Sequence, residues 1–551
     1  MSFEKSRHAK AGGSIRQRSG ATWALRSTSL AALVIAGCHC HAPPTPPPPP
    51  VCTPPTIAID PSLVVHDPAL LAARFGLSRT LQAIIDTSGG AATSPANLLS
   101  SMLQTFDDPS MVNGGHTLPL DVRPAEAGLP AADLLDPASA RGMVPVGLFN
   151  RFDLAPADGN NCGEYRIVYA KNQASPGRLL LIFESRLRNP DPASGLEGCL
   201  PVAQFWTDLA GEPDPTARIT KLESFYYTGL PGFDAVVRHR NYGAPLGQVR
   251  SNLFVTPLWE LREHRAGFDL ASRAVFLPGT VGESPVAELY RPGLAPGFSA
   301  PDSVAFRDHF GSQPLCNLLR PDRVDSSATR FDIVNGIGAG FDRDWLDGQS
   351  VSQNPSDDPA SGPDASFVTQ IAGRLGTLGV TSVGATEALH RAGAMSCGGC
   401  HQFSNGRPLS IGGANPWPSS RGFVHIDEGG GLSEALDDFF LPRRAQILSR
   451  FMCSHLPEPS PSAPCPGVTA TTAAAGSARA RPTDYLAPAD AARDALIQAA
   501  RRAQSAHEAI RSAAVASEVA AAVRRFNEEV DRARAHERAL PGAFVPVRRV
   551  H

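Results

Sequence analysis

The spacing of apolar residues changes along the chain and predicts different elements in successive segments. Residues 66–108 carry apolar residues at helical spacing, interrupted by Gly and Ser clusters. Residues 144–290 carry instead short runs of β-forming residues bounded by Gly, Pro and Asn. Examples of these runs are residues 144–149, 165–169, 179–183 and 249–255. The pattern predicts an α+β fold, in which a loop-rich antiparallel sheet is flanked by helices.

The C-terminal half has a weaker pattern. Residues 291–364 predict mostly loops, and helical spacing returns at 367–375 and 386–392. After Cys465, a stretch rich in Thr, Ala, Gly and Ser is typical of a linker. Residues 489–538 are rich in Ala and Arg, which favour helix, but their apolar stripe is thin. We therefore expect this helical region to pack on a neighbour.

Composition narrows the class of protein. At ~150 residues per domain, a chain of 551 residues has room for two to four domains. The 51 Pro and 50 Gly predict many turns and long connections. Without residues 1–37, which hold six basic residues and one acidic residue, 44 Lys and Arg face 52 Asp and Glu, a formal charge of −8. This mildly acidic balance argues against nucleic acid as a partner.

The N-terminus has the order of parts that export requires. Six Lys and Arg residues precede an apolar stretch at residues 29–36, which is too short to span a bilayer. The stretch ends in Ile35-Ala36-Gly37-Cys38. This sequence resembles the bacterial lipobox, in which a lipid is attached to the cysteine and cleavage makes that cysteine the new N-terminus. The resemblance implies a signal peptide at residues 1–37 and lipidation of Cys38.

A lipidated Cys38 would anchor the chain to a membrane. Two or more acyl chains give stable anchoring, and a triacylated cysteine meets that condition. Residues 42–50 are Pro-rich and predict an extended spacer of ~3 Å per residue. We expect the protein in the cell envelope. His39 stands where an Asp favours retention in the inner membrane of enteric bacteria, so the outer membrane is the favoured location.

The ten cysteines of an exported chain predict disulfides, because the space outside the inner membrane is oxidising. Connectivity cannot be deduced from sequence, and proximity along the chain is the only guide. It suggests three pairs, with Cys38 reserved for lipid and Cys316 left over. The pairs are Cys40 with Cys52, Cys162 with Cys199, and Cys453 with Cys465.

Cys397-Gly398-Gly399-Cys400-His401 is the one motif in the chain that points to specific chemistry. Two thiols separated by two residues can each form a thioether with a vinyl group of one haem, and the adjacent histidine then becomes the proximal iron ligand. The motif resembles the attachment site of c-type cytochromes, as does the short helix predicted at residues 386–391. The resemblance implies haem c on Cys397 and Cys400, with His401 bound to iron.

The motif is also compatible with haem-free chemistry. Cys397 and Cys400 can form a disulfide with each other or with other cysteines, which would leave His401 merely adjacent. A zinc site is less favoured, because the chain has a single such cysteine pair and oxidising compartments disfavour thiolate ligands. A thioredoxin-like motif would need a βαβ pattern around it, which the sequence lacks.

A c-type haem usually has a sixth ligand downstream of the motif. Met452 is the first choice by its distance from the motif, and it follows a helix-like run from residue 432 to 451. Cys453 beside it suggests instead that a disulfide holds this segment, and a methionine in the core is the ordinary alternative. His425 is the other candidate. The choice matters, because a histidine ligand gives a lower redox potential than methionine does.

Two charged clusters are weaker candidates for a binding or catalytic site. Arg151, Asp153, Glu164 and Arg166 alternate with strand-forming residues and can meet on one face of the sheet. An ion-pair network at a sheet edge explains them more simply. His239 stands between two arginines, which suggests an anionic ligand; these arginines are Arg238 and Arg240.

Taken together, the sequence resembles lipoproteins of GC-rich bacteria that carry one cytochrome-c-like motif in their C-terminal half. The resemblance implies a membrane-anchored envelope haem protein that transfers electrons to or from a partner protein. The alternative is a haem-free binding or structural lipoprotein held together by disulfides. The expected division is a signal peptide (1–37), a Pro-rich tether (38–60), an α+β domain (61–364), a cytochrome-c-like segment (365–466), a linker (467–488) and a helical C-terminal region (489–551).

Overall fold

A computed structural model describes residues 52–172, 177–256, 258–319, 339–353, 358–413 and 416–456. All of these residues belong to one structural unit, Cys52–His551. Several expected features lie outside the described residues, so the structure says nothing of them. They are the signal peptide with Cys38, most of the tether, Cys40, Cys465, the linker and the helical C-terminal region.

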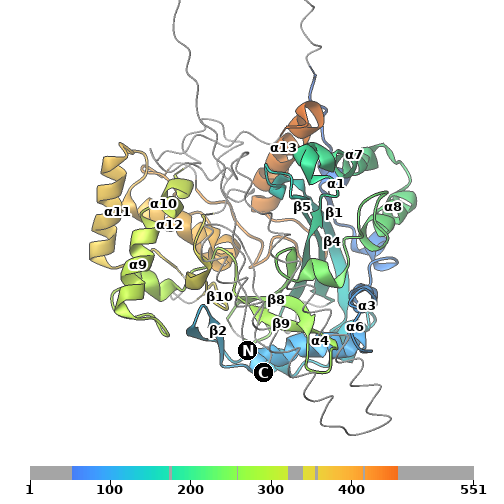
Figure 1. Cartoon of the computed structure of the whole chain (residues 1–551), viewed down its shortest axis with the longest axis horizontal. Helices are drawn as coiled ribbons and strands as arrows, with labels where there is room; N and C mark the ends of the chain where they lie inside the picture. The colour runs from blue at the N-terminus through green and yellow to red at the C-terminus, as the bar shows by residue number, and fades with distance from the viewer. Residues whose placement is uncertain are drawn as a thin grey trace, which may run out of the picture. The chain divides into compact units, whose positions relative to one another are not determined.

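An eight-stranded antiparallel sheet within these residues, flanked by helices, confirms the α+β class (Figure 1). Its order is β1-β4-β5-β6-β7-β8-β10, and β9 pairs with β8 outside this path. β2 and β3 form a separate hairpin. The strands are β1 Val64–Val65, β2 Ser110–Asn113, β3 His116–Pro119, β4 Met143–Arg151, β5 Asn161–Lys171, β6 Leu179–Arg188, β7 Gly247–Leu253, β8 Glu260–Phe268, β9 Ala274–Gly279 and β10 Ser350–Val351.

The helices confirm the helical patterns of the N-terminal part and of the segment before the motif. The α-helices are α1 Ile59–Ser62, α2 Pro68–Ala72, α3 Leu77–Asp86, α4 Pro95–Gln104, α5 Pro124–Ala127, α6 Ala131–Leu135, α7 Leu200–Asp208, α8 Pro215–Tyr227, α9 Ala300–Phe310, α10 Gln313–Leu318, α11 Ala365–Thr377, α12 Ala385–Met395 and α13 Leu441–Ser454. Short 3-10 helices are η1 Thr105–Asp107, η2 Phe152–Leu154, η3 Pro192–Cys199, η4 Leu209–Gly211, η5 His239–Tyr242, η6 Ala287–Tyr290 and η10 Arg343–Trp345. Two π-helical turns are η12 Gly399–Phe403 and η13 Ala435–Phe440.

The two faces of the sheet differ in chemistry because side chains alternate along each strand. One cross-strand row consists of Ile167, Phe183, Val249 and His264, and its apolar members belong to the main core. The neighbouring row on the opposite face consists of charged and polar residues. It contains Arg166, Glu184 and Gln248. The sheet therefore has one apolar face and one face rich in buried charge.

A second apolar core lies among α9, α10, α11 and α12, which Figure 1 shows grouped together. Tyr290 contacts the rings of Phe306 and Phe310 there. The sequence pattern predicted mostly loops for residues 291–364, but α9 and α10 lie within this range. The main core contains residues from both the expected α+β domain (61–364) and the expected cytochrome-c-like segment (365–466). For example, the ring of Phe152 in η2 packs on the ring of Phe451 in α13, with ring centres 4.6 Å apart.

Disulfides correct part of the sequence-based pairing. Cys162 pairs with Cys199, as expected. Cys52 pairs with Cys453, although 401 residues separate them, so the expected pairs of Cys52 with Cys40 and of Cys453 with Cys465 are wrong. Nearness along the chain did not predict this pair, because the fold brings α13 next to the first described residues. There the Ser449 hydroxyl also donates to the carbonyl of Pro55. Cys316 is disulfide-bonded as well and is therefore not left over.

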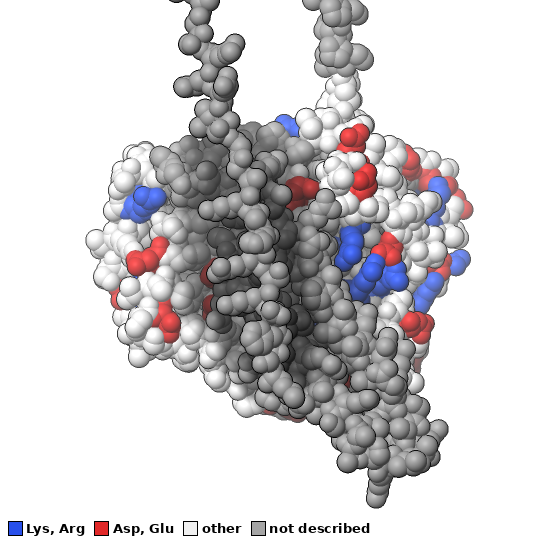
Figure 2. All heavy atoms as spheres, viewed as in Figure 1, with Lys and Arg blue, Asp and Glu red and all other residues white. Residues whose placement is uncertain are grey.

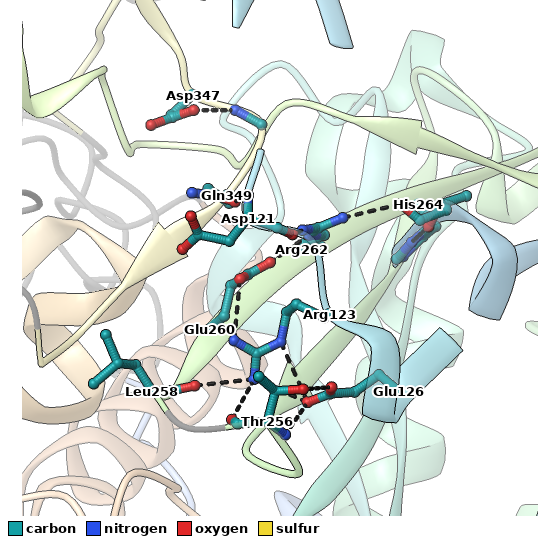
Figure 3. A network of polar contacts seen from close by, with 12 residues as sticks. Asp121, Arg123, Glu126, Thr256, Leu258, Glu260, Arg262, His264, Asp347 and Gln349 are labelled. Carbon is teal, nitrogen blue, oxygen red and sulfur yellow. Dashed lines mark hydrogen bonds and ion pairs between the residues drawn. The ribbon is translucent and has the colours of Figure 1, made fainter. Parts of the chain in front are cut away.

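A buried charged network joins β8 to the segment before α5 (Figure 3). We call Arg123, Glu126, Glu260 and Arg262 the charged network. The Arg123 guanidinium donates to Glu126 at 2.9 Å and to Glu260 at 3.3 Å, and Arg262 pairs with Glu260. Glu126 also accepts from the backbone N–H groups of Val255 and Thr256. All four charged side chains are buried, and each has a partner of opposite charge.

The surface offers two further observations. On the face seen in Figure 2, basic and acidic side chains of the described residues lie interspersed. Within the described part of the chain, no helix combines the length and the apolar character that a membrane span requires.

Candidate functional site

The cysteine motif follows α12 directly and is packed tightly against its neighbours. α12 ends at Met395, and the Ser396 hydroxyl then donates to the Gly393 carbonyl and accepts from the Gly399 N–H. A Cβ on Gly399 would lie 1.9 Å from the Gly393 oxygen, and a Cβ on Gly398 would lie 2.5 Å from the Val351 oxygen. Only glycine fits at both positions, so the residues between the two cysteines are set by packing.

Cys397 and Cys400 are free thiols in the described structure, and they are not joined to each other. Cys397 is buried beside Trp259, Leu261 and Val281. Cys400 is partly accessible, and its sulfur lies 3.2 Å from Nε2 of His425. Burial raises the pKa of Cys397 to about 11 and that of Cys400 to about 12. Both groups are therefore neutral thiols at neutral pH.

His401 is held at one ring nitrogen. Its Nδ1 lies 2.9 Å from the carbonyl oxygen of Phe423. Because a carbonyl can only accept, Nδ1 carries the proton and the lone pair of the ring is at Nε2. The imidazole stacks on the indole of Trp259, with ring centres 5.0 Å apart. Burial lowers the pKa of His401 to about 4, so the ring is neutral and its Nε2 is a donor of the kind that metals bind.

His425 lies beside His401, with ring centres 4.7 Å apart. Its Nδ1 is 2.9 Å from the hydroxyl of Ser433, which leaves Nε2 toward Cys400. Burial holds the pKa of His425 well below its usual range. Met452 lies in α13 and packs, partly buried, against the main core. Of the two residues suggested as sixth ligand, His425 is thus the one that contacts the motif.

We call the neutral group around the motif the histidine network. Its members come from β7, from the segment after β7 and from the segment between η12 and η13, in addition to the motif. Spacing along the sequence does not predict that these segments meet. Trp259 donates through Nε1 to Oδ1 of Asn252, and Nδ2 of Asn252 donates to the carbonyl of Phe423. The members of the histidine network are Cys400, His401, His425, Ser433, Asn252, Trp259 and the Phe423 carbonyl.

The cluster of Arg151, Asp153, Glu164 and Arg166 forms ion pairs on the charged face of the sheet. Arg151 pairs with Asp153 at 2.8 Å, and Arg166 pairs with Glu164 at 2.7 Å and with Glu184 at 3.1 Å. Burial favours the neutral form of Glu164, but Arg166 and the neighbouring arginines outweigh it and lower its pKa to about 2. Arg151, Glu164, Arg166 and Glu184 lie in the central strands β4, β5 and β6, and not at an edge of the sheet.

This charged face lies close enough to the motif to influence it. Arg250 extends the row, because it pairs with Glu263 at 2.7 Å and with Glu184 at 3.3 Å. Burial raises the pKa of Cys397, and the positive charge of Arg250 opposes that rise. Burial lowers the pKa of His401, and the positive charges of Arg250 and Arg166 lower it further. The ion-pair row is therefore part of the electrostatic surroundings of the motif.

The segment around His239 is bound internally. Arg238 and Arg240 both pair with Asp234, and His239 is buried, with Nε2 3.2 Å from the carbonyl of Gly267. Within the described ranges, no group of three or more His, Cys, Asp or Glu residues is arranged to hold a metal ion. The expectation of an anionic ligand at these arginines has no support from these contacts.

Comparison with known proteins adds no family assignment. No family model matches the chain, and no curated protein matches it. No solved structure matches it either. The function must therefore be argued from the chain's own residues.

Proposed function

We propose that this chain is a membrane-anchored envelope lipoprotein that carries one covalent c-type haem and transfers electrons. The observation that carries the proposal is the arrangement of the motif itself. Cys397 and Cys400 are free thiols with two residues between them, and His401 follows them with Nδ1 bound to a backbone carbonyl. Such a second-sphere partner is typical of histidines that bind metal through the other nitrogen.

The donor set fits the chemistry of haem attachment. Cys397 and Cys400 would each add their S–H across one vinyl group, so that sulfur bonds to carbon and the proton goes to the neighbouring vinyl carbon. Nε2 of His401 would bind iron, since Nδ1 is already protonated and engaged with Phe423. When bound, the haem supplies a one-electron redox centre. The chain's own residues hold it, exclude water from it and tune its potential.

His425 is the candidate sixth ligand that contacts the motif, and its ring would have to separate from that of His401, now 4.7 Å away between ring centres, for both to bind one iron. It is a neutral, buried imidazole next to His401, and Ser433 orients it. Met452 remains the alternative from sequence spacing. A second histidine would place the potential lower than methionine would, because imidazole stabilises ferric iron relative to a thioether.

Nucleophilic catalysis is a second use of the same residues. Cys400, His425 and Ser433 form a line of nucleophile, base and orienting group, with 3.2 Å and 2.9 Å contacts. A reactive cysteine needs a lowered pKa, however, and burial raises that of Cys400 to about 12. The thiol would remain protonated and a poor nucleophile, which disfavours nucleophilic catalysis by Cys400.

The position of Cys52 supports a role close to the membrane. A lipid on Cys38 would lie 14 residues before Cys52, and an extended tether of this length spans roughly 40 Å. The Cys52–Cys453 disulfide attaches the end of that tether to α13. The redox partner that we propose is therefore a protein within this reach of the bilayer.

The test is to express the full chain in bacteria that have the haem-attachment machinery. We expect a Soret band, a pyridine haemochrome spectrum typical of two thioether bonds, and a mass increase of one haem. The double variant Cys397→Ser with Cys400→Ser should lose all three and still fold. Haem absent from the wild-type chain, or two sulfurs oxidised to each other, would overturn the proposal.

The anchor needs a separate test. In Cys38→Ser the lipid cannot attach, so we expect the protein to move from the membrane fraction to the soluble fraction after cell breakage. Cys40→Ser is the matched control, since it removes a cysteine two residues away and keeps the lipobox. If Cys38→Ser stays in the membrane fraction, the proposed anchor is wrong.

A further inference from the structure

The carbonyl oxygen of Phe423 accepts two hydrogen bonds from different parts of the chain. One comes from Nδ1 of His401 at 2.9 Å, and the other comes from Nδ2 of Asn252 at 3.3 Å. Asn252 belongs to β7, far before the motif in the chain. A backbone oxygen shared in this way divides its acceptor capacity between the two donors.

Asn252 is itself fixed by a second contact. Its Oδ1 accepts from the indole N–H of Trp259, and the Trp259 ring stacks on the ring of His401. Both Asn252 and Trp259 are buried. The hydrogen bond from Trp259 identifies Oδ1 as the acceptor, so the amide group of Asn252 must present its N–H₂ end to Phe423.

The backbone at Phe423 is held in a conformation that bulky residues rarely adopt. Its φ is 68°, in the left-handed region. The side chain stacks on Phe254, with ring centres 5.3 Å apart. This packing and the two hydrogen bonds together keep the carbonyl aimed at His401. Strained residues that are held by several contacts tend to cluster at functional sites.

We propose that Asn252 is a positioning residue that sets the ligand strength of His401 through the Phe423 carbonyl. This inference rests on the proposed haem and deepens it. A strong acceptor at Nδ1–H draws the proton away and gives the imidazole anionic character, which stabilises ferric iron. Asn252 weakens that acceptor by donating to the same oxygen. It therefore raises the midpoint potential, and the sheet tunes the redox centre.

Asn252→Leu is the variant that tests this role. It has nearly the same size, carries no charge and removes the second donor to Phe423. We expect the haem-loaded variant to have a lower midpoint potential in a mediated redox titration. The ferric low-spin EPR signal should shift in the direction of greater imidazolate character. A merely structural role for Asn252 would change neither readout.

Asn189→Leu is the matched control. It also replaces a buried asparagine whose Nδ2 donates to backbone carbonyls, those of Gly159 and Gly195, which are not part of the histidine network, so its potential should remain close to that of the wild type. Asn252→Asp provides a second variant if Asn252→Leu does not fold. When the new side chain is a neutral carboxyl it can donate to the Phe423 carbonyl, and when it is a carboxylate it cannot. The midpoint potential of the Asn252→Asp variant should therefore fall with rising pH more steeply than that of the wild type.

The outcomes separate this inference from the proposed function. A wild-type chain without haem overturns both. If haem is present and the potential and EPR signal of Asn252→Leu equal those of the wild type, the role of Asn252 is wrong and the haem proposal stands. A folded Asn252→Asp whose potential follows the pH dependence of the wild type would contradict the role of Asn252 independently.

Discussion

The charged network and the histidine network both bury polar side chains, but they stabilise them in different ways. The charged network ties β8 to the segment before α5 with ion pairs, such as that of Arg123 with Glu260. The histidine network ties β7 to the cysteine motif with uncharged groups. Its thiol at Cys400 has a raised pKa and its imidazoles have lowered ones, so they are neutral at neutral pH.

This difference separates a structural tie from the ligand site that we propose. In the charged network the Glu126 oxygens accept from the Arg123 guanidinium, from the N–H groups of Val255 and Thr256 and from the Thr256 hydroxyl, so each of the two oxygens already has a donor. In the histidine network, by contrast, each imidazole is held at Nδ1, and the ring of His401, whose Nδ1–H donates to a carbonyl, has its lone pair at Nε2. Only the second arrangement has donor atoms that can bind a metal without breaking a charge pair.

The largest effect is expected from breaking the charged network. Arg123→Ala would leave Glu126 and Glu260 buried without the cation that both contact. Removing one partner of a buried ion pair costs about 3–5 kcal/mol, because an uncompensated charge remains. We expect a fall of that size in the free energy of unfolding, measured by urea denaturation.

An exposed pair provides the control for this variant. Arg273 pairs with Asp269, and its side chain is 52% exposed. Arg273→Ala should therefore lower the free energy of unfolding by only about 0–1 kcal/mol. Equal losses in the two variants would contradict the view that burial makes Arg123 a structural tie.

Acid should weaken the fold through His264, at the edge of the charged network (Figure 3). Burial, with a smaller effect of Arg262, lowers its pKa from 6.5 to about 3. Below pH 6.5 the unfolded chain binds a proton that the folded chain excludes, so stability falls as pH falls. At about 1.4 kcal/mol per pH unit, His264 alone should account for about 2 kcal/mol between pH 6.5 and 5.

His264→Gln tests this contribution, because glutamine can keep a contact with the Thr105 hydroxyl, which lies 3.0 Å from Nε2 of His264, and does not titrate. Urea denaturation of both proteins from pH 7 to pH 5 measures the slope of stability against pH. The variant should show the smaller slope. Parallel curves for the two proteins would show that His264 is protonated as easily in the folded chain as in the unfolded one.

Local patterns in the sequence predicted strands β4, β5, β6 and β7 and the helix before the motif, because alternation and helical spacing act over a few residues. The pairing of Cys162 with Cys199 followed from nearness along the chain, and the same rule failed for Cys52 and Cys453. A signal for one missed helix was present, since Ser299 and Asp302 form a capping box at the start of α9. Here the weak apolar periodicity concealed the helix.

The residues around the motif were beyond sequence reasoning for a different reason. Asn252 and Trp259 carry no motif, and the importance of Asn252 comes from its contact with a loop 171 positions later. His425 was only the second choice as iron ligand because distance along the chain favoured Met452. Long-range packing decides such contacts, and one sequence does not record it. The cysteine motif was visible because its chemistry depends on residues that are adjacent.

A smaller effect on stability than that of Arg123→Ala is expected inside the histidine network, at Ser433. Ser433→Ala removes a hydroxyl that lies 2.9 Å from Nδ1 of His425 and accepts from the N–H of Leu436, and each lost hydrogen bond of this kind costs about 1 kcal/mol. In the haem-loaded chain the same change should alter the ferric spectrum, since second-sphere partners of a ligand commonly change metal affinity by roughly 10–100-fold. Ser449→Ala, which removes a hydroxyl bond from α13 to Pro55, is the matched control and should leave the spectrum unchanged. An unaltered spectrum in Ser433→Ala, together with an altered one in Met452→Ala, would transfer the role of sixth ligand from His425 to Met452.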